Sequence, residues 1–359
     1  MGNADFAPSA DVIVIGAGLI GLALARDLRA RGLRPLVLEA GRAGREASWA
    51  GAGMLAAYRT SDMALRPLAV AAARLYPGWV AELEHETGMN TGYRESGTLF
   101  LASPGHPAPS PALEGWEPMT GEAVAELEPE LRFAGDVWRI AGDHCVDNRA
   151  LSAALAESLR RSGVEVRERA RVTAVRAAGG GLTVETPAGR MAAAVVVNCA
   201  GAWAGGFDAP AAAEVRPRKG QMFALRHAPD VRHVIAGERV YLVPRGGGRV
   251  LVGATLEDCG FDASVSQEML AGLRQRAEAL VPGLARAEME EAWAGFRPGT
   301  PDERPLIGET SRRGYWMATG HFRDGILLAP LTAKIVASAI AKGHLTKALD
   351  LRAFAPERF

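Results

Sequence analysis

The chain has 359 residues with 41 basic and 41 acidic side chains, so its formal net charge at pH 7 is zero. That balance gives no bulk attraction to nucleic acid or to an anionic membrane surface, and neither partner is expected. The length exceeds that of one ordinary domain and predicts two hydrophobic cores.

The termini, the apolar segments and the cysteines narrow the class of protein further. Residues 1–10 hold neither a basic cluster nor an apolar run, so no signal peptide is expected. The apolar segments 192–207 and 325–341 are interrupted by polar residues, glycine or proline, and neither is expected to span a membrane. The chain has three cysteines, Cys145, Cys199 and Cys259. They are too scattered along the sequence for a zinc site and odd in number for a disulfide framework. We therefore expect no metal site and a reducing, cytoplasmic environment.

The first forty residues predict a dinucleotide-binding unit. An apolar strand over 11–15 meets the glycines of G-x-G-x-x-G, a helix follows, and a second strand ends in Glu39. Gly16 permits the tight turn, Gly18 lets the backbone approach a pyrophosphate, and Gly21 lets the helix pack on the sheet. Glu39 has the spacing of a carboxylate that accepts ribose hydroxyls. Glycines that serve packing alone are the alternative, which the ordered strand, turn, helix, strand and acid disfavour.

The central segments alternate between types of structure. Residues 41–57 are rich in Gly, Ala and Ser, as in a loop that something flat approaches closely. Helical spacing over 62–86 predicts one helix, or two separated at Pro77. The further expected elements are a strand at 93–102, a Pro-rich surface loop at 103–118, a helix at 147–161 capped by Asp147 or Asn148, strands at 164–167, 171–176 and 194–197, an antiparallel sheet over 216–255 and a helix at 266–280.

The carboxyl-terminal segment places a glycine loop before an apolar helix. A strand is expected at 315–318 and a helix at 326–341, with Asp324 suited to cap the helix. Such a helix terminus, if aimed at a flavin, stabilises negative charge on the reduced ring, whereas an ordinary capped core helix is the alternative. Because parallel and antiparallel segments are interleaved, the order favours a flavin-type fold over a contiguous NAD domain.

Several motifs together resemble the FAD-dependent amine oxidases of the D-amino acid oxidase superfamily, and among its branches the glycine oxidases of thiamine biosynthesis. The motifs are ASWAGAGMLA, NCAGAW, RKGQM, YLVPR, VGATLE, GFRPGTPD and GHFRDGILLAP. The resemblance implies a mixed α/β fold, in which a Rossmann-like FAD-binding domain of the glutathione reductase type is interleaved with an antiparallel-sheet substrate domain. The expected division gives 1–80, 142–215 and 296–359 to the first domain and 81–141 and 216–295 to the second.

The resemblance also assigns roles to single residues. Arg297 of the RPGT motif would bind the substrate carboxylate, Tyr241 would donate a hydrogen bond to the same group, and Arg323 would lie nearby. A guanidinium suits this role because it binds a carboxylate in bidentate fashion and stays charged. Each arginine has a plainer alternative, a surface position for Arg297 and a pairing with a neighbouring acid for Arg323.

A larger set is expected to bind the cofactor, which should be FAD held without a covalent bond. Relatives with covalent flavin use a histidine near the ASW segment or a cysteine near the RPGT segment, whereas this chain has Ala50 in the first region and no cysteine in GFRPGTPD. The expected FAD contacts are Gly16, Gly18, Gly21, Glu39, Ser48, Gly53, Met54, Val172, Gly201, Trp203, Arg323, Asp324, Gly325, Ile326 and Leu327.

The activity that the resemblance implies is the oxidation of a small amino acid. Glycine, a small D-amino acid or a secondary amine would give a 2-oxo acid and ammonia, and dioxygen would be reduced to hydrogen peroxide. A D-amino acid dehydrogenase that passes electrons to a quinone or another acceptor is the alternative enzyme. A flavin-binding scaffold without catalysis of its own is the alternative from another class. A homo-oligomer is expected, as is common among such proteins.

Overall fold

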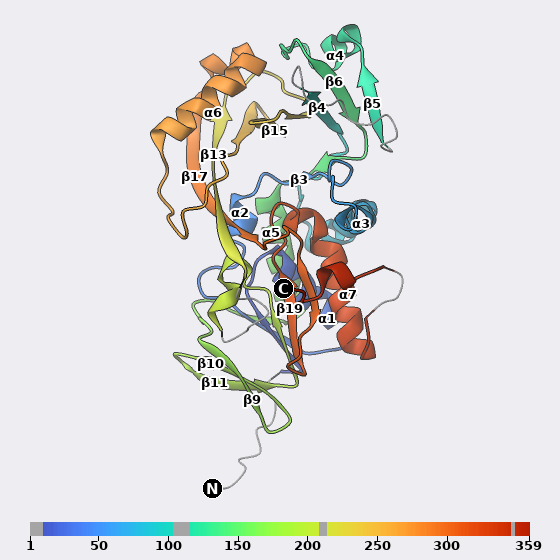
Figure 1. The fold of residues 1–359 in the computed structure, drawn as a ribbon, viewed down its shortest axis with the longest axis vertical. Helices are drawn as coiled ribbons and strands as arrows, with labels where there is room; N and C mark the ends of the chain where they lie inside the picture. Colours follow the sequence, from blue (N-terminus) through green and yellow to red (C-terminus); the bar gives the residue numbers. More distant parts are fainter. Residues whose placement is uncertain (1–9, 103–114, 208–213, 346–348) are drawn as a thin grey trace.

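The computed structural model describes residues 10–102, 115–207, 214–345 and 349–359. These residues form a six-stranded sheet in one half of the molecule and an eight-stranded sheet in the other half (Figure 1). The first sheet has the order β18-β19-β12-β1-β2-β8, and only its β18–β19 pair is antiparallel. Its strands are β1 (Val12–Ile15), β2 (Pro35–Leu38), β8 (Glu165–Arg167), β12 (Val195–Asn198), β18 (Leu306–Glu309) and β19 (Tyr315–Thr319).

The strands of this sheet are apolar on both faces because each face is covered, as parallel sheets require. Val12 and Val14 of β1 pack under four helices, whereas Ile13 and Ile15 face a small antiparallel sheet. The helices are α1 (Leu19–Ala30), α3 (Leu65–Thr87), α5 (Asn148–Arg161) and α7 (Gly325–Lys342). The small sheet consists of β9 (Ala174–Ala178), β10 (Gly181–Thr186) and β11 (Gly189–Ala193).

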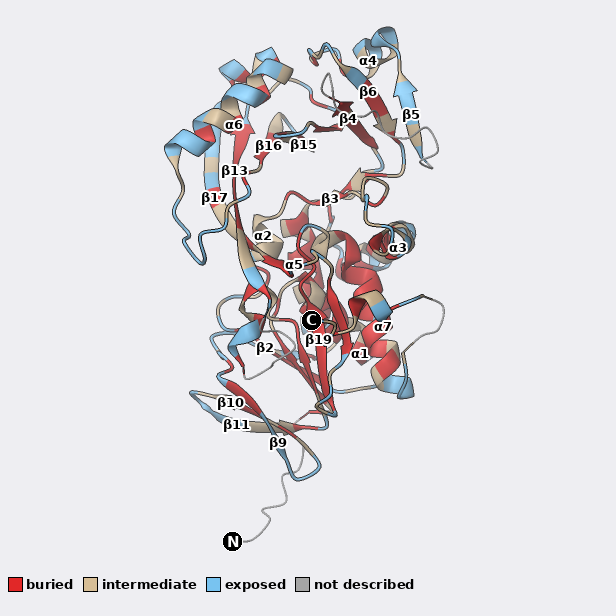
Figure 2. Ribbon diagram, in the orientation of Figure 1, coloured by how far each residue is buried: buried red, intermediate tan, exposed pale blue. Residues whose placement is uncertain are grey.

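The second sheet has the order β17-β13-β16-β15-β14-β4-β6-β5. One face packs against α6 (Gln267–Leu280), whose outer side is exposed (Figure 2). Its strands are β4 (Thr98–Ala102), β5 (Trp116–Met119), β6 (Asp136–Ile140), β13 (Arg216–Arg226), β14 (Val234–Ala236), β15 (Tyr241–Gly246), β16 (Arg249–Gly253) and β17 (Glu288–Gly299). The remaining elements include α2 (Ala47–Ala50), β3 (Met54–Leu55), α4 (Gly121–Leu127), β7 (His144–Cys145) and a 3₁₀ turn over Gly201–Gly206.

The expected mixed fold with a Rossmann-like sheet is confirmed, with differences in detail. The second sheet is not wholly antiparallel, because β14 pairs in parallel with β4. Residues 62–86 give one helix, α3, which continues through Pro77. The strand expected at 93–102 begins only at Thr98, and the one expected at 171–176 begins only at Ala174. Where the two domains divide along the chain stays a prediction.

The Pro-rich stretch 103–118 was expected to be a loop throughout. Residues 103–114 lie outside the described residues, and the end of the stretch enters β5 instead. Pro118 is tolerated there because β5 is the last strand of its sheet, so its missing N–H leaves no ladder bond unmade on the outer side.

Helix α7 is the one helix among the described residues that has the length and apolarity to cross a membrane, with a mean hydropathy of 1.5 over 18 residues. In this structure 61% of that stretch is buried, against α1 and α3. Such burial is the pattern of a core helix, which explains its composition without a bilayer.

Candidate active site

A cavity of about 1090 Å³ reaches from the turn after β1, past segment 47–54, to the strands of the second sheet. Its size lies above the range of about 300–1,000 Å³ that is usual for sites of drug-sized ligands. The structure brings fifteen of the predicted site residues to this cavity: Gly16, Gly18, Glu39, Ser48, Gly53, Met54, Val172, Gly201, Trp203, Tyr241, Arg297, Arg323, Asp324, Gly325 and Ile326.

Two predicted cofactor residues, Gly21 and Leu327, do not line the cavity. Gly21 lies inside α1, where an added Cβ would stand 1.9 Å from the carbonyl oxygen of Gly16. Leu327 is buried among the core residues of the helical face. Both residues therefore support the wall of the cavity from behind.

The turn after β1 has the features that a dinucleotide requires. Gly16 has φ +101°, and α1 begins at Leu19, after the N-cap residue Gly18, which has no side chain to cap the helix. The Leu19 N–H donates to the Ser48 hydroxyl at 2.9 Å, and the first turn of α1 lines the cavity without a carboxylate, which suits a pyrophosphate. Glu39 accepts hydrogen bonds from the backbone N–H groups of Ala17 at 2.8 Å and Gly41 at 2.7 Å. The carboxylate thus fixes the turn and keeps further lone pairs for ribose hydroxyls.

The amino terminus of α7 faces the same cavity. Asp324 occupies its N-cap position, but the carboxylate accepts no capping hydrogen bond, so the predicted cap is wrong. Burial raises the pKa of Asp324 to about 6, and the nearby guanidinium groups of Arg59 and Arg323 counteract that shift. Because the carboxylate leaves the first N–H groups of α7 free, the helix terminus can stabilise negative charge on a flavin. Two helix amino termini at one cavity, neither with an acidic residue in its first turn, fit FAD.

Three predicted substrate residues converge at the other end of the cavity. Arg297 on β17 donates to the backbone oxygen of Thr255 at 3.3 Å, a contact that leaves most of its five N–H groups available. Burial raises the pKa of Tyr241, while a hydrogen bond and the charge of Arg297 act in the opposite direction. The phenol therefore stays protonated and can donate. Arg323 is exposed to the cavity, and the N–H of Phe322 donates to the Pro298 oxygen at 2.9 Å, which ties its loop to the RPGT segment.

Segment 47–54, which forms one wall of the cavity, is held through its carbonyl groups. Asn148 Nδ2 donates to the Ser48 oxygen at 2.7 Å and to the Trp49 oxygen at 3.1 Å. Trp293 Nε1 donates to the Ala50 oxygen at 3.0 Å. These donors come from α5 and β17, so both halves of the molecule fix the wall.

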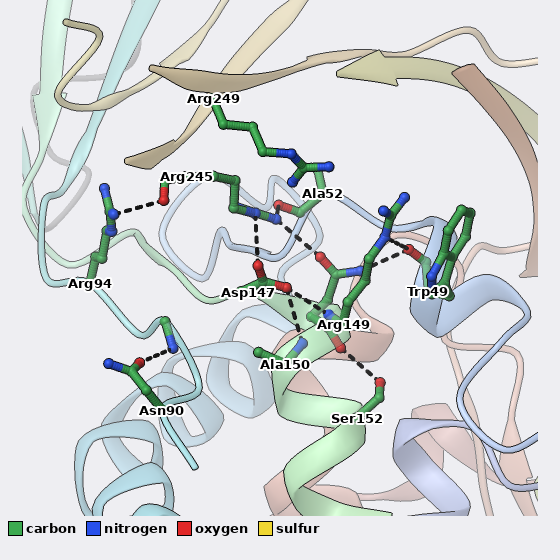
Figure 3. Close-up of polar contacts among 12 residues, drawn as sticks. Trp49, Ala52, Asn90, Arg94, Asp147, Arg149, Ala150, Ser152, Arg245 and Arg249 are labelled. Atoms are coloured by element: carbon green, nitrogen blue, oxygen red, sulfur yellow. Dashed lines mark hydrogen bonds and ion pairs between the residues drawn. The ribbon is translucent and has the colours of Figure 1, made fainter. Parts of the chain in front are cut away.

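Arg245 on β15 completes this support (Figure 3). Its Nη2 atom donates to the Ala52 oxygen at 2.7 Å and to Asn148 Oδ1 at 3.0 Å, and its Nε lies 3.8 Å from Asp147 Oδ2. The side chain is only 7% exposed, so these bonds are made in a site of low dielectric. The Arg245 backbone oxygen in turn accepts a hydrogen bond from Arg94 Nη2 at 3.0 Å.

We expect Arg245→Met to lower the free energy of unfolding by about 2–4 kcal/mol and to weaken FAD retention, because buried acceptors lose a charged donor. The matched control is Arg226→Met, which removes an ion pair with Glu288 whose two side chains are each 57% exposed. Because that pair is exposed to solvent, the change should lower the free energy of unfolding much less than Arg245→Met does. Urea unfolding of the FAD-loaded variants measures both values, and equal losses would contradict the role of Arg245.

Sequence reasoning missed these supporting residues. Asn148 was expected only as a helix cap, although Asp147 is the residue whose side chain caps α5. Arg245 belongs to the YLVPR motif, but no role was predicted for it. Its acceptors, the Ala52 oxygen and Asn148 Oδ1, lie 193 and 97 residues away in the sequence. The sequence offers one hint for Arg245, because this residue follows apolar strand residues within YLVPR, one of the motifs that carry the family resemblance.

Comparison with known proteins agrees with this geometry. The profile of a family described as "FAD dependent oxidoreductase" matches residues 11–339. Glycine oxidase of Geobacillus kaustophilus is 36% identical over 97% of this chain and 97% of that protein. The crystal structure of a glycine oxidase from the same organism superposes with a TM-score of 0.90, at 33% identity over 98% of this chain and 99% of that one.

Two further relatives extend the comparison. The bifunctional protein ThiO/ThiG of a Synechocystis species is 37% identical over 98% of this chain, which spans only 54% of that protein. The chain thus covers about half the length of such bifunctional relatives. The iminodiacetate oxidase of a Chelativorans species superposes with a TM-score of 0.84, at 26% identity over 96% of this chain and 98% of that one.

Proposed function

Because the chain belongs to the family of FAD-dependent oxidoreductases, we propose that it oxidises glycine or another small amino acid with dioxygen as the electron acceptor. The amine carbon and nitrogen lose two electrons and two protons, which dioxygen takes up as hydrogen peroxide. Water then splits the C=N bond to give the 2-oxo acid and ammonia. Similarity to glycine oxidases and to ThiO/ThiG proteins supports glycine as the substrate and thiamine biosynthesis as the setting. A cytoplasmic location and a homo-oligomeric state stay predictions.

One observation supports this proposal above the others, namely that Arg297, Tyr241 and the amino terminus of α7 face a single cavity. FAD, when bound, supplies the chemistry as a two-electron acceptor. Arg297 binds the carboxylate, and Tyr241 donates to the same group, so the amine and its Cα are held in one orientation. Trp203 and Phe296 also line the cavity and contact each other edge to face, so they give it an apolar wall.

The test of the function is peroxide production by the purified protein in air with glycine, sarcosine, D-alanine and D-proline. Glycine is expected to give glyoxylate, ammonia and peroxide in equal amounts. If glycine bleaches the flavin without air but yields no peroxide in air, the protein is a dehydrogenase. If no amino acid bleaches the flavin, the proposed function is wrong.

The FAD is expected to leave the protein on acid precipitation, because the described cavity lining near Ala50 and the RPGT segment offers no histidine or cysteine for a covalent bond. His321 and Cys199 do line the cavity, but both are buried, and burial lowers the pKa of His321 and raises that of Cys199. Absorbance at visible wavelengths should appear in the supernatant. Yellow colour that stays with the pellet would contradict the expectation.

A further inference from the structure

A third arginine, Arg59, lines the cavity that also holds Arg297 and Arg323. It follows β3, the strand that carries Met54. Its Nη2 atom lies 3.8 Å from the sulfur atom of Met54, and its Nε lies 3.4 Å from Asp143 Oδ2. No hydrogen bond joins Arg59 to an oxygen atom elsewhere in the described ranges. The guanidinium therefore has donors to spare.

Asp143 holds this arginine from behind. Its side chain is fully buried, and its Oδ1 accepts a hydrogen bond from the backbone N–H of Tyr58 at 2.8 Å. The hydroxyl of Thr98 donates to the Asp143 backbone oxygen at 3.3 Å, which fixes the loop on β4. Because Asp143 approaches the guanidinium through Nε and the Met54 sulfur lies beside Nη2, the Nη1 group and the second N–H of Nη2 are left for a ligand.

The three guanidinium groups line one cavity together with the phenol of Tyr241. The charges of Arg297, Arg59 and Arg323 each lower the pKa of Tyr241, against the larger effect of burial, so each lies within electrostatic range of its hydroxyl. Two carboxylates oppose them, Asp324 and Asp143, and burial raises the pKa of each to about 6. With one substrate carboxylate on Arg297 and Tyr241, Arg59 still has terminal N–H groups that no oxygen atom of the described residues accepts.

We propose that Arg59 forms a second anion subsite, so that the enzyme accepts small amino acids and N-substituted glycines that carry a second carboxylate. This inference rests on the proposed amine oxidation with the first carboxylate on Arg297. For iminodiacetate, one C–H bond and the N–H bond break, and dioxygen takes the two electrons and two protons as peroxide. Water adds to the C=N bond, and its cleavage gives glyoxylate and glycine.

Binding of inert analogues tests the subsite without turnover. Diglycolate matches iminodiacetate but has an ether oxygen in place of the amine, and methoxyacetate is its partner with one carboxylate. In the FAD-loaded wild type, titration followed by the flavin absorption spectrum should show diglycolate binding about tenfold or more tightly than methoxyacetate. Arg59→Gln should abolish this ratio, and Arg59→Lys should keep part of it because the charge remains.

Turnover supplies the second readout. The ratio of kcat/KM for iminodiacetate to that for sarcosine, which has one carboxylate, should fall about tenfold or more in Arg59→Gln. Because that change leaves Asp143 without its cation, Arg59→Gln combined with Asp143→Asn gives a second variant that has no orphaned charge. It should show the same loss of ratio.

The outcomes separate the subsite from the proposed function. Equal weakening of diglycolate and methoxyacetate in Arg59→Gln, or no change in their ratio, overturns the subsite. If diglycolate binding depends on Arg59 but no amine is oxidised, the proposed function fails while the subsite stands. If glycine is oxidised and the wild type binds the two analogues equally, the function stands and the subsite fails.

Discussion

Arg297→Ala should raise the KM for glycine by about 100-fold or more while the protein keeps its FAD. The guanidinium lies at the substrate end of the cavity, where it donates long hydrogen bonds to the backbone oxygens of Thr255 at 3.3 Å and Lys219 at 3.5 Å and also interacts with the Tyr241 hydroxyl. Loss of one partner from a buried, hydrogen-bonded charge pair costs about 2–5 kcal/mol, and about 2.8 kcal/mol corresponds to 100-fold.

The control for this prediction is Arg297→Lys, which keeps the charge but loses the planar fork. It should give an intermediate KM, because a lysine ammonium cannot bind a carboxylate in bidentate fashion. Steady-state kinetics and the ratio of flavin to protein absorbance measure both variants. A normal KM in Arg297→Ala, or loss of FAD from this variant, would contradict the role of Arg297 in binding the substrate carboxylate.

The parts of the fold that were predictable are those whose causes are local. The βαβ unit follows from apolar runs and three glycines within about 30 residues, and β1 begins and ends within one residue of the expected strand at 11–15. The caps of α5 and α6 were also predictable, because Asp147 and Ser266 accept hydrogen bonds from backbone groups two or three residues ahead.

The parts that were not predictable depend on distant contacts. Pro77 does not divide α3, because the helix is held along its length against α7, where the Tyr76 hydroxyl donates to the backbone oxygen of Ile326. The parallel pairing of β14 with β4 joins residues more than 130 positions apart. Asp324 occupies the N-cap position of α7 without a capping hydrogen bond, and one of the charges that act on its carboxylate, that of Arg59, comes from far away in the sequence.

The candidate site divides in the same way. Arg297, Tyr241 and Arg323 were placed through motifs, and the structure brings them to one cavity, while their roles stay predictions. The supporting roles of Asn148 and Arg245 were not predicted, because their acceptors include backbone carbonyl groups, which every residue type provides. Any residue at position 52 would offer the same backbone oxygen to Arg245.

The glycine turn carries the other large effect, because Gly16→Ala should leave a protein that binds little or no FAD. An added Cβ would stand 2.5 Å from the backbone oxygen of Cys199 and 2.9 Å from its carbonyl carbon. The Cys199 carbonyl group directly follows β12, and the Cys199 N–H donates to the Ile15 oxygen at 2.8 Å. The carbonyl group therefore cannot move aside without disturbing the pairing of β12 with β1. The turn must open instead, which displaces the first N–H groups of α1 from the pyrophosphate position.

Gly32→Ala separates this clash from backbone strain. Gly32 has φ +82° in the turn after α1, and an added Cβ there would meet no atom within 4 Å. The left-handed conformation alone costs about 1–2 kcal/mol, so Gly32→Ala should lower the melting temperature slightly and keep FAD at the wild-type ratio. The flavin-to-protein absorbance ratio and the thermal unfolding of both variants decide the matter. If Gly16→Ala retains FAD as well as Gly32→Ala does, the cofactor does not lie along this turn.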